Sequence, residues 1–176
     1  IGGVRGPVTG IAANPVYINL VRKGVPLTSE TAKSEKSLSM DVRYLDLKGK
    51  KVDHTALAQG SDSMMVVNVT NTSFTQQENM ALNIMVPSGW EIRNTRLFEA
   101  DYGLSESQYD YRDFRDDRVN TFFSLQVNET KTFMLILNAA YRGSFIQPSV
   151  WCEAMYNNNC YARIPGGPVR VVAAKN

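Results

Sequence analysis

The stretch from Asn120 to Ala139, NTFFSLQVNETKTFMLILNA, decides the fold class. In its first part Thr121, Phe123, Leu125 and Val127 share one face, and the residues between them share the other. A period of two is typical of a half-buried β-strand. Polar residues 128–130 follow, and residues 131–139 form a second apolar run. We therefore predict two antiparallel strands joined by a tight turn, a β-hairpin.

Similar apolar segments recur along the chain at intervals of roughly ten residues, with turn residues between them. They cover residues 37–45, 63–70, 81–86, 150–156, 161–164 and 168–172. No segment carries a sustained apolar stripe at helical spacing, although Asp53–Gly60 is predicted to form one helical turn capped by Asp53. This pattern predicts an all-β fold, an antiparallel, Ig-like β-sandwich of seven or more strands.

Composition excludes several classes of function. The chain has 176 residues and a net charge of +2, so no basic excess indicates a nucleic-acid partner. Its apolar runs are too short for membrane insertion. The single histidine, His54, is predicted to be a solvated surface residue, and no nucleotide-binding or nucleophile motif occurs. We therefore expect no enzyme activity, no metal and no cofactor.

The segment Tyr109–Arg118, YDYRDFRDDR, concentrates charge of both signs. Clustered carboxylates can bind Ca²⁺, but each acid here has an arginine neighbour that competes with a cation. We interpret the segment as a structural ion-pair cluster that orders a loop. Its core is predicted to be Arg115, Asp116, Asp117 and Arg118.

Two further pairs of residues leave alternatives open. Residues 150–156 and 161–164 flank the polar Asn157–Asn159 and are predicted to form a second hairpin. Cys152 and Cys160 bracket its turn, where either a disulfide or two free thiols is compatible with the spacing. Trp90 and Trp151 could stack on a sugar or pack in the core.

Several motifs, in order, resemble the last macroglobulin-like domain of bacterial α2-macroglobulins. They are VDHTALAQGSDSMMVVNVTN, ALNIMVPSGWEIRNTRL, YDYRDFRDDRVNTFFSL, LNAAYRGSFIQPSVWCEAMYNNNCYAR and the closing GGPVRVV. The resemblance covers roughly residues 37–176, and NPVYINLVRKGVP, which begins at Asn14, is similar to a returning strand of the preceding CUB domain. It implies that residues 1–36 are a connection and CUB-like strand, and that 37–176 are the C-terminal macroglobulin domain.

The resemblance also implies a function. Members of this family are large, extracytoplasmic protease traps of the periplasm or cell envelope, in which a bait segment is cut and a thioester captures the protease. The thioester motif Cys-x-x-Gln is absent from this sequence. We therefore expect a non-catalytic domain of an endopeptidase inhibitor, with thioester and CUB-like domains of the same polypeptide as partners and target proteases bound by the full-length protein. The chain begins IGGVRGPVTG, and we expect it to be a piece of a longer polypeptide.

The motif EAMY marks the place where the family sets a Met-Tyr pair against the thioester. The resemblance thus implies that Met155 and Tyr156 shield the thioester. Neighbours on a regular strand point to opposite faces, so both can cover one spot only if the strand ends or bulges there. The alternative function is an independent extracytoplasmic ligand-binding or adhesion sandwich, which an exposed, coplanar aromatic pair would favour.

Overall fold

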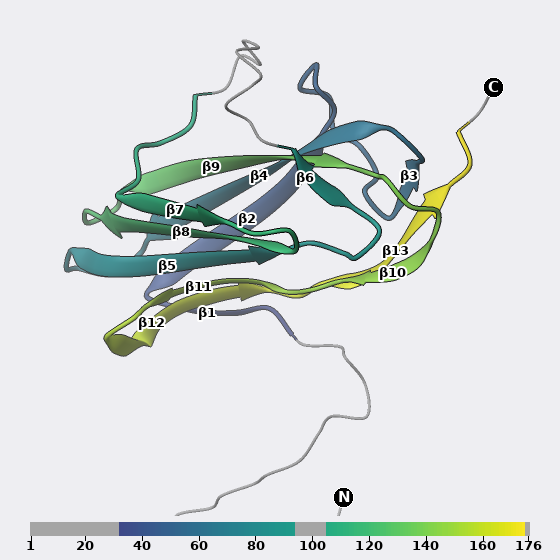
Figure 1. Cartoon of the computed structure of the whole chain (residues 1–176). Coiled ribbons are helices and arrows are strands. Elements are labelled where there is room, and N and C mark those ends of the chain that lie inside the picture. Colours follow the sequence, from purple (N-terminus) through teal and green to yellow (C-terminus); the bar gives the residue numbers. More distant parts are fainter. Residues whose placement is uncertain (1–31, 94–104, 175–176) are drawn as a thin grey trace, which may run out of the picture.

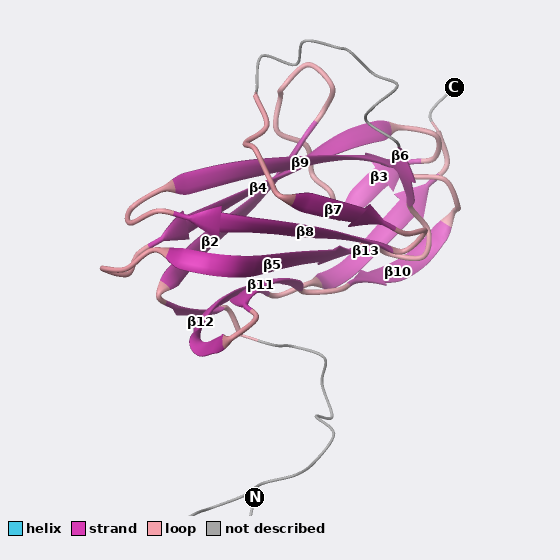
Figure 2. Ribbon diagram, turned by 60° about the vertical axis from the view of Figure 1, so that its left-hand side comes forward, coloured by secondary structure: helices cyan, strands magenta, loops and turns pink. Residues whose placement is uncertain are grey.

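The protein is a β-sandwich without helices in the part of the chain that the computed structural model describes, residues 32–93 and 105–174 (Figures 1 and 2). This confirms the all-β prediction. The strands are β1 (Ser34–Lys36), β2 (Leu38–Leu45), β3 (Ala56–Ala58), β4 (Asp62–Asn71), β5 (Gln77–Met85), β6 (Glu91–Arg93), β7 (Tyr111–Phe114), β8 (Arg118–Leu125), β9 (Thr130–Asn138), β10 (Gly143–Gln147), β11 (Val150–Ala154), β12 (Asn157–Ile164) and β13 (Gly167–Val172).

The strands form three sheets. The larger face of the sandwich is a six-stranded sheet in the order β1-β12-β11-β5-β8-β7, and the opposite face is a four-stranded sheet in the order β2-β4-β9-β6. A three-stranded sheet, β10-β13-β3, lies at one end. The pairings are antiparallel as predicted, except that β13 runs parallel to β3, with Arg170 opposite Ala56.

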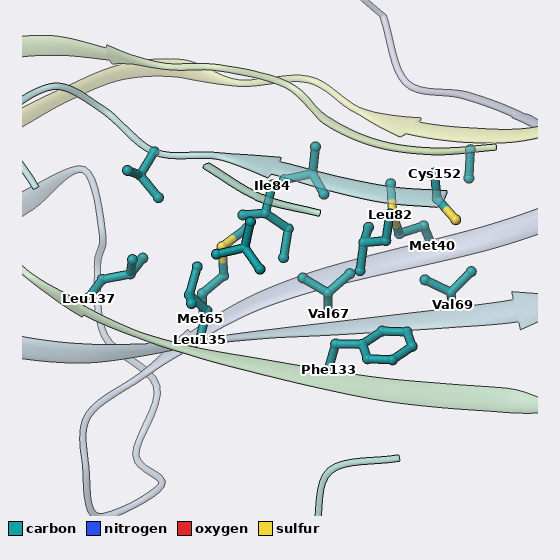
Figure 3. Packing of buried hydrophobic residues seen from close by; sticks show 14 of the residues in the cluster. Met40, Met65, Val67, Val69, Leu82, Ile84, Phe133, Leu135, Leu137 and Cys152 are labelled. Carbon is teal, nitrogen blue, oxygen red and sulfur yellow. The ribbon is translucent and has the colours of Figure 1, made fainter. Parts of the chain in front are cut away.

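The core lies between the two main sheets and follows the predicted alternation. In β8 the buried residues are Val119, Thr121, Phe123 and Leu125. Methionines and valines of β2 and β4, together with leucines of the neighbouring strand β9, face Leu82 and Ile84 of β5 across the interior (Figure 3). Phe123 of one sheet packs on Phe133 of the other with ring centroids 4.6 Å apart. The contact joins the two halves of the segment that predicted the fold.

Two local predictions were wrong. Strands β8 and β9 are not a hairpin: β8 pairs with β5 and β7, whereas β9 pairs with β4 and β6 in the other sheet. The turn between them is therefore an arch that crosses the sandwich. Residues 53–60 form no helical turn, because Ala56–Ala58 is strand β3, and Asp53 instead accepts hydrogen bonds from the backbone N–H and hydroxyl of Thr55.

The second predicted hairpin, β11–β12, is confirmed, with Cys152 opposite Ala162. Its turn is Met155–Tyr156, however, and the predicted turn residues Asn157–Asn159 begin strand β12. The predicted CUB-like strand lies outside the described residues. Of residues 1–36, which the resemblance assigns to the connection and the CUB-like strand, Ser34–Lys36 pairs with β12 as strand β1 of the six-stranded sheet. Within the described ranges no helix is long and apolar enough to cross a membrane.

Candidate functional site

The candidate site is the turn between β11 and β12. Strand β11 ends at Ala154 and β12 begins at Asn157, so Met155 and Tyr156 are turn residues. The side chain of Tyr156 is 85% exposed and that of Met155 is 43% exposed. Because neither residue belongs to a regular strand, the rule that neighbours point to opposite faces does not apply to them.

Hydrogen bonds hold this turn from both sides. The backbone N–H of Met155 donates to the carbonyl oxygen of Asn79 on β5, with N···O 3.0 Å. On the other side Lys36 Nζ donates to Asn159 Oδ1 at 2.6 Å, and the Asn159 N–H donates to Asn157 Oδ1 at 3.1 Å. The ladder also shifts register between Glu153 and Ala154, whose partners are Tyr161 and Asn157, so residues 158–160 of β12 form a bulge next to the turn. The turn is therefore an anchored feature that presents its two apolar side chains to solvent.

The predicted ion-pair cluster forms exposed pairs instead of one network. Arg118 binds Asp117 through two hydrogen bonds of 2.9 and 2.7 Å, and Arg115 binds Asp113 at 2.8 Å. The hydrogen bond from Arg118 lowers the pKa of Asp117. Asp116 has no ion-pair or hydrogen-bond partner among the described residues. These pairs therefore face water at the surface.

The buried ion pair of this segment involves Arg112, which sequence reasoning missed. Its side chain is only 4% exposed, and Nη2 lies 2.7 Å from Glu106 Oε1. Nε donates to Thr121 Oγ1 at 2.9 Å, and the guanidinium lies 4.2 Å from the centroid of the Tyr109 ring. Glu106 also accepts the backbone N–H of Met134 at 2.9 Å, so this contact ties the loop before β7 to β9. The charge pattern gave no signal that distinguishes Arg112 from its neighbours.

Both cysteines are buried free thiols, which resolves the alternative that the spacing had left open. Burial raises the pKa of the Cys152 thiol, and Cys160 adds to the effect. Burial also raises the pKa of Cys160. Both side chains point into the sandwich and are poor nucleophiles, because the thiolate is the reactive form.

The tryptophans offer little free ring surface. Trp90 is buried in the core. Trp151 is half-buried on the outer face of the six-stranded sheet, parallel to Tyr161 with ring centroids 5.6 Å apart. The guanidinium of Arg163 lies 5.3 Å from the centre of the Trp151 ring. Both neighbours therefore compete with a sugar for the faces of that ring.

A cavity of about 640 Å³ lies beside His54, between β2 and the segment that joins β12 to β13. His54 was predicted to be a solvated surface residue, but it is half-buried and stacks on Tyr44, with centroids 4.0 Å apart and planes 9° from parallel. Burial lowers the pKa of His54 and raises that of Tyr44. Neither here nor elsewhere in the described ranges does a group of three or more His, Cys, Asp or Glu side chains lie close enough together to hold a metal ion.

Comparison with known proteins gives the family. The model of the bacterial alpha-2-macroglobulin MG10 domain matches residues 38–159. An alpha-2-macroglobulin of Rickettsia conorii is 25% identical over 86% of this chain and 8% of its own length. An alpha-2-macroglobulin homolog of Yersinia pestis is 23% identical over 92% of this chain and 9% of its own length. The chain therefore spans less than a tenth of the length of these curated relatives.

Solved structures show the same fold. Salmonella alpha-2-macroglobulin reacted with methylamine superposes with a TM-score of 0.75 at 19% identity, over 85% of this chain and 10% of that one. The native conformation of the E. coli protein gives a TM-score of 0.72 at 18% identity, with the same coverage. Since the family model matches more than half of the sequence, this chain belongs to the bacterial alpha-2-macroglobulin MG10 domain family.

Proposed function

We propose that this chain is the C-terminal macroglobulin domain of a larger bacterial α2-macroglobulin-like endopeptidase inhibitor, located in the periplasm or cell envelope. Residues 37–176 are the domain and residues 1–36 connect it to a CUB-like domain, with the last of these, Ser34–Lys36, joining the sandwich as the edge strand β1. Family membership supports this proposal, as does the small share of each relative that the chain covers. The domain has a structural role, and target proteases are bound by the full-length protein.

We further propose that the β11–β12 turn packs on the thioester domain of the same polypeptide and that Met155 and Tyr156 cover the thioester. The observation that carries this proposal is the exposure of both side chains on an anchored turn. If the two had been buried inside the sandwich, neither could reach another domain. Their exposure in this chain leaves them available for such a contact.

The chemistry of the two residues suits the role. Water hydrolyses a thioester, so the bond survives only where water is excluded. Methionine is flexible and polarizable and fills irregular gaps, while tyrosine adds a rigid ring with one polar tip. The Met155–Asn79 hydrogen bond limits how far the turn can swing away from β5.

The test uses the full-length protein with Tyr156→Gly. We expect faster spontaneous release of the thioester thiol in the absence of methylamine, because the variant leaves a gap through which water enters. The control is Tyr141→Gly, since Tyr141 is also exposed but lies between β9 and β10 at the other end of the sandwich. An unchanged release rate in Tyr156→Gly contradicts the shielding role, as does a full-length protein in which methylamine releases no thiol.

A further inference from the structure

Phe74 stands almost entirely in water. Its side chain is 97% exposed, the highest value among the exposed large apolar residues described. It lies in the loop between β4 and β5. A single exposed apolar residue needs no explanation in a soluble protein. Two further observations indicate that the exposure of Phe74 has a function.

The first observation is that the loop is rigid. The Asn71 side chain is buried, and its Nδ2 donates to the carbonyl oxygens of Thr75 at 2.8 Å and Gln126 at 3.0 Å. Its Oδ1 accepts the backbone N–H of Ser73 at 2.9 Å. Residues on both sides of Phe74 are therefore held by hydrogen bonds, and the residue projects from them into solvent. Because the loop backbone is already ordered, little backbone entropy is lost when Phe74 binds.

Gln77 adds to this network from the start of β5. Its Nε2 donates to Ser73 Oγ and to Thr75 Oγ1, both at 3.0 Å. Gln77 is itself buried. Two buried polar side chains, Asn71 and Gln77, thus stabilise the loop in a conformation in which Phe74, its only large apolar residue, is exposed to solvent.

The second observation is that Phe74 shares its end of the sandwich with the candidate site. Asn71 joins the Phe74 loop to the β8–β9 turn, which carries the exposed Val127. Strand β5 starts next to that loop, and its Asn79 binds Met155. Figure 1 shows these three turns together at the left of the molecule. We name this set the turn-end surface: Phe74, Val127, Met155 and Tyr156.

Exposed polar residues flank the members of the turn-end surface along the chain. They include Gln76, Glu78 and Asn157. An apolar centre with a polar border is the usual organisation of a protein–protein interface. The surface is small, which suits a partner on the same polypeptide, because covalent linkage raises the effective concentration of the partner.

We infer that Phe74 is an anchor that docks this domain on the thioester domain of the same polypeptide. This inference rests on the proposed function and extends it. Phe74 enters an apolar recess of that domain and fixes the orientation of the sandwich, and this orientation keeps Met155 and Tyr156 over the thioester. The relatives are more than ten times longer than this chain, so proteins of this family contain much further chain on which the domain can dock.

The test compares hydroxyl-radical oxidation of this chain alone and of the full-length protein, residue by residue. We expect oxidation of Phe74, Met155 and Tyr156 to be slower in the full-length protein by roughly tenfold or more. If Met155 and Tyr156 are protected while Phe74 reacts as fast as in the single chain, the inference is wrong and the proposed function stands. If none of the three is protected, both are wrong.

A variant then distinguishes two roles of Phe74: a residue that holds the domain in its docked orientation, and a residue that the docked domain only buries. Phe74→Ser in the full-length protein should raise Met155 oxidation and spontaneous thiol release by roughly tenfold, because the docked state loses the burial of one phenyl ring. Tyr141→Ser is the matched control and should change neither rate. Since Phe74 is exposed, the variant chain alone should unfold at the same temperature as the wild type. Unchanged Met155 oxidation and thiol release in Phe74→Ser overturn the inference.

Discussion

The backbone N–H of Met155 donates a hydrogen bond to the carbonyl oxygen of Asn79, and Asn79 has a left-handed backbone conformation with φ of 54°. The pairing of β5 with β8 shifts register at the same place, between Gln77 and Met80. The unusual backbone of Asn79 thus lies at an irregularity of β5, where its carbonyl group is available to the β11–β12 turn. Asparagine tolerates this conformation better than other residues with a Cβ atom, apart from aspartate.

Replacement of Asn79 should therefore loosen the turn. We expect Asn79→Ala to lower the free energy of unfolding by about 1 kcal/mol, because alanine disfavours the left-handed region. The Met155 amide should also exchange faster with deuterium. Asn79→Gly is the control and should be close to the wild type, since glycine adopts positive φ freely. Urea unfolding and hydrogen exchange measure the two effects. Equal stability of Asn79→Ala and the wild type would contradict this account.

Local periodicity predicted strands and faces well, but it could not predict which sheet a strand joins. The alternation assigned the inward side chains Thr121, Phe123 and Leu125 of β8 correctly, whereas Val127, predicted on the same face, lies beyond the strand and is exposed. The four residues that separate β8 from β9 can make a hairpin or an arch. The choice depends on β4, a strand buried along most of its length, which takes the place beside β9. The pairing of β9 with β4 depends on residues that are distant in sequence, so the residues around the β8–β9 turn carry no signal of it.

The candidate site was located by its motif, whereas its exposure and support come from the fold. The tetrapeptide EAMY marks Met155 and Tyr156, but only the end of β11 at Ala154 releases both from the strand. Phe74 and Asn71 gave no comparable signal, because a polar loop with one aromatic residue is common. Arg112 was overlooked for the same reason: burial selects one arginine among three, and the covering loop is distant in sequence.

The contrast between Arg112 and Arg115 gives a second prediction. Arg112→Ala removes a buried cation and leaves Glu106 and Thr121 without their partner, so we expect a loss of about 3 kcal/mol in the free energy of unfolding. Arg115→Ala is the matched control. Its side chain is 66% exposed, and we expect no measurable change in midpoint. Urea unfolding at neutral pH compares the two variants. Similar midpoints for both would show that the contacts of Arg112 contribute little.

The buried cysteines give a third prediction, on reactivity. Because burial raises the pKa of both Cys152 and Cys160, neither is a reactive thiolate at neutral pH. Ellman's reagent should therefore label no thiol of the native chain within minutes and should label both in urea. This also means that these thiols add no background to the thiol-release experiments. Rapid labelling of one thiol in the native chain would show that a cysteine is accessible.

The last prediction concerns pH. Burial against Tyr44 lowers the pKa of His54 below its ordinary value of 6.5, although Asp53 opposes the shift. The unfolded chain, in which His54 is hydrated, then takes up a proton at a higher pH than the folded chain does. The stability that the neutral His54 contributes is therefore fully present above pH 6.5, and it is lost as the pH falls from 6.5 through the pKa of the folded state.

His54 is the only histidine in the sequence, so one variant isolates its effect. We expect the melting temperature of the wild type to fall between pH 7 and pH 5, and His54→Gln to flatten most of that slope because glutamine does not titrate. Differential scanning calorimetry at fixed ionic strength measures both proteins. Carboxylates such as Asp117, whose pKa is also lowered, act below this range and should affect both proteins equally. An equal slope in His54→Gln would mean that the stacked histidine is not the group that titrates.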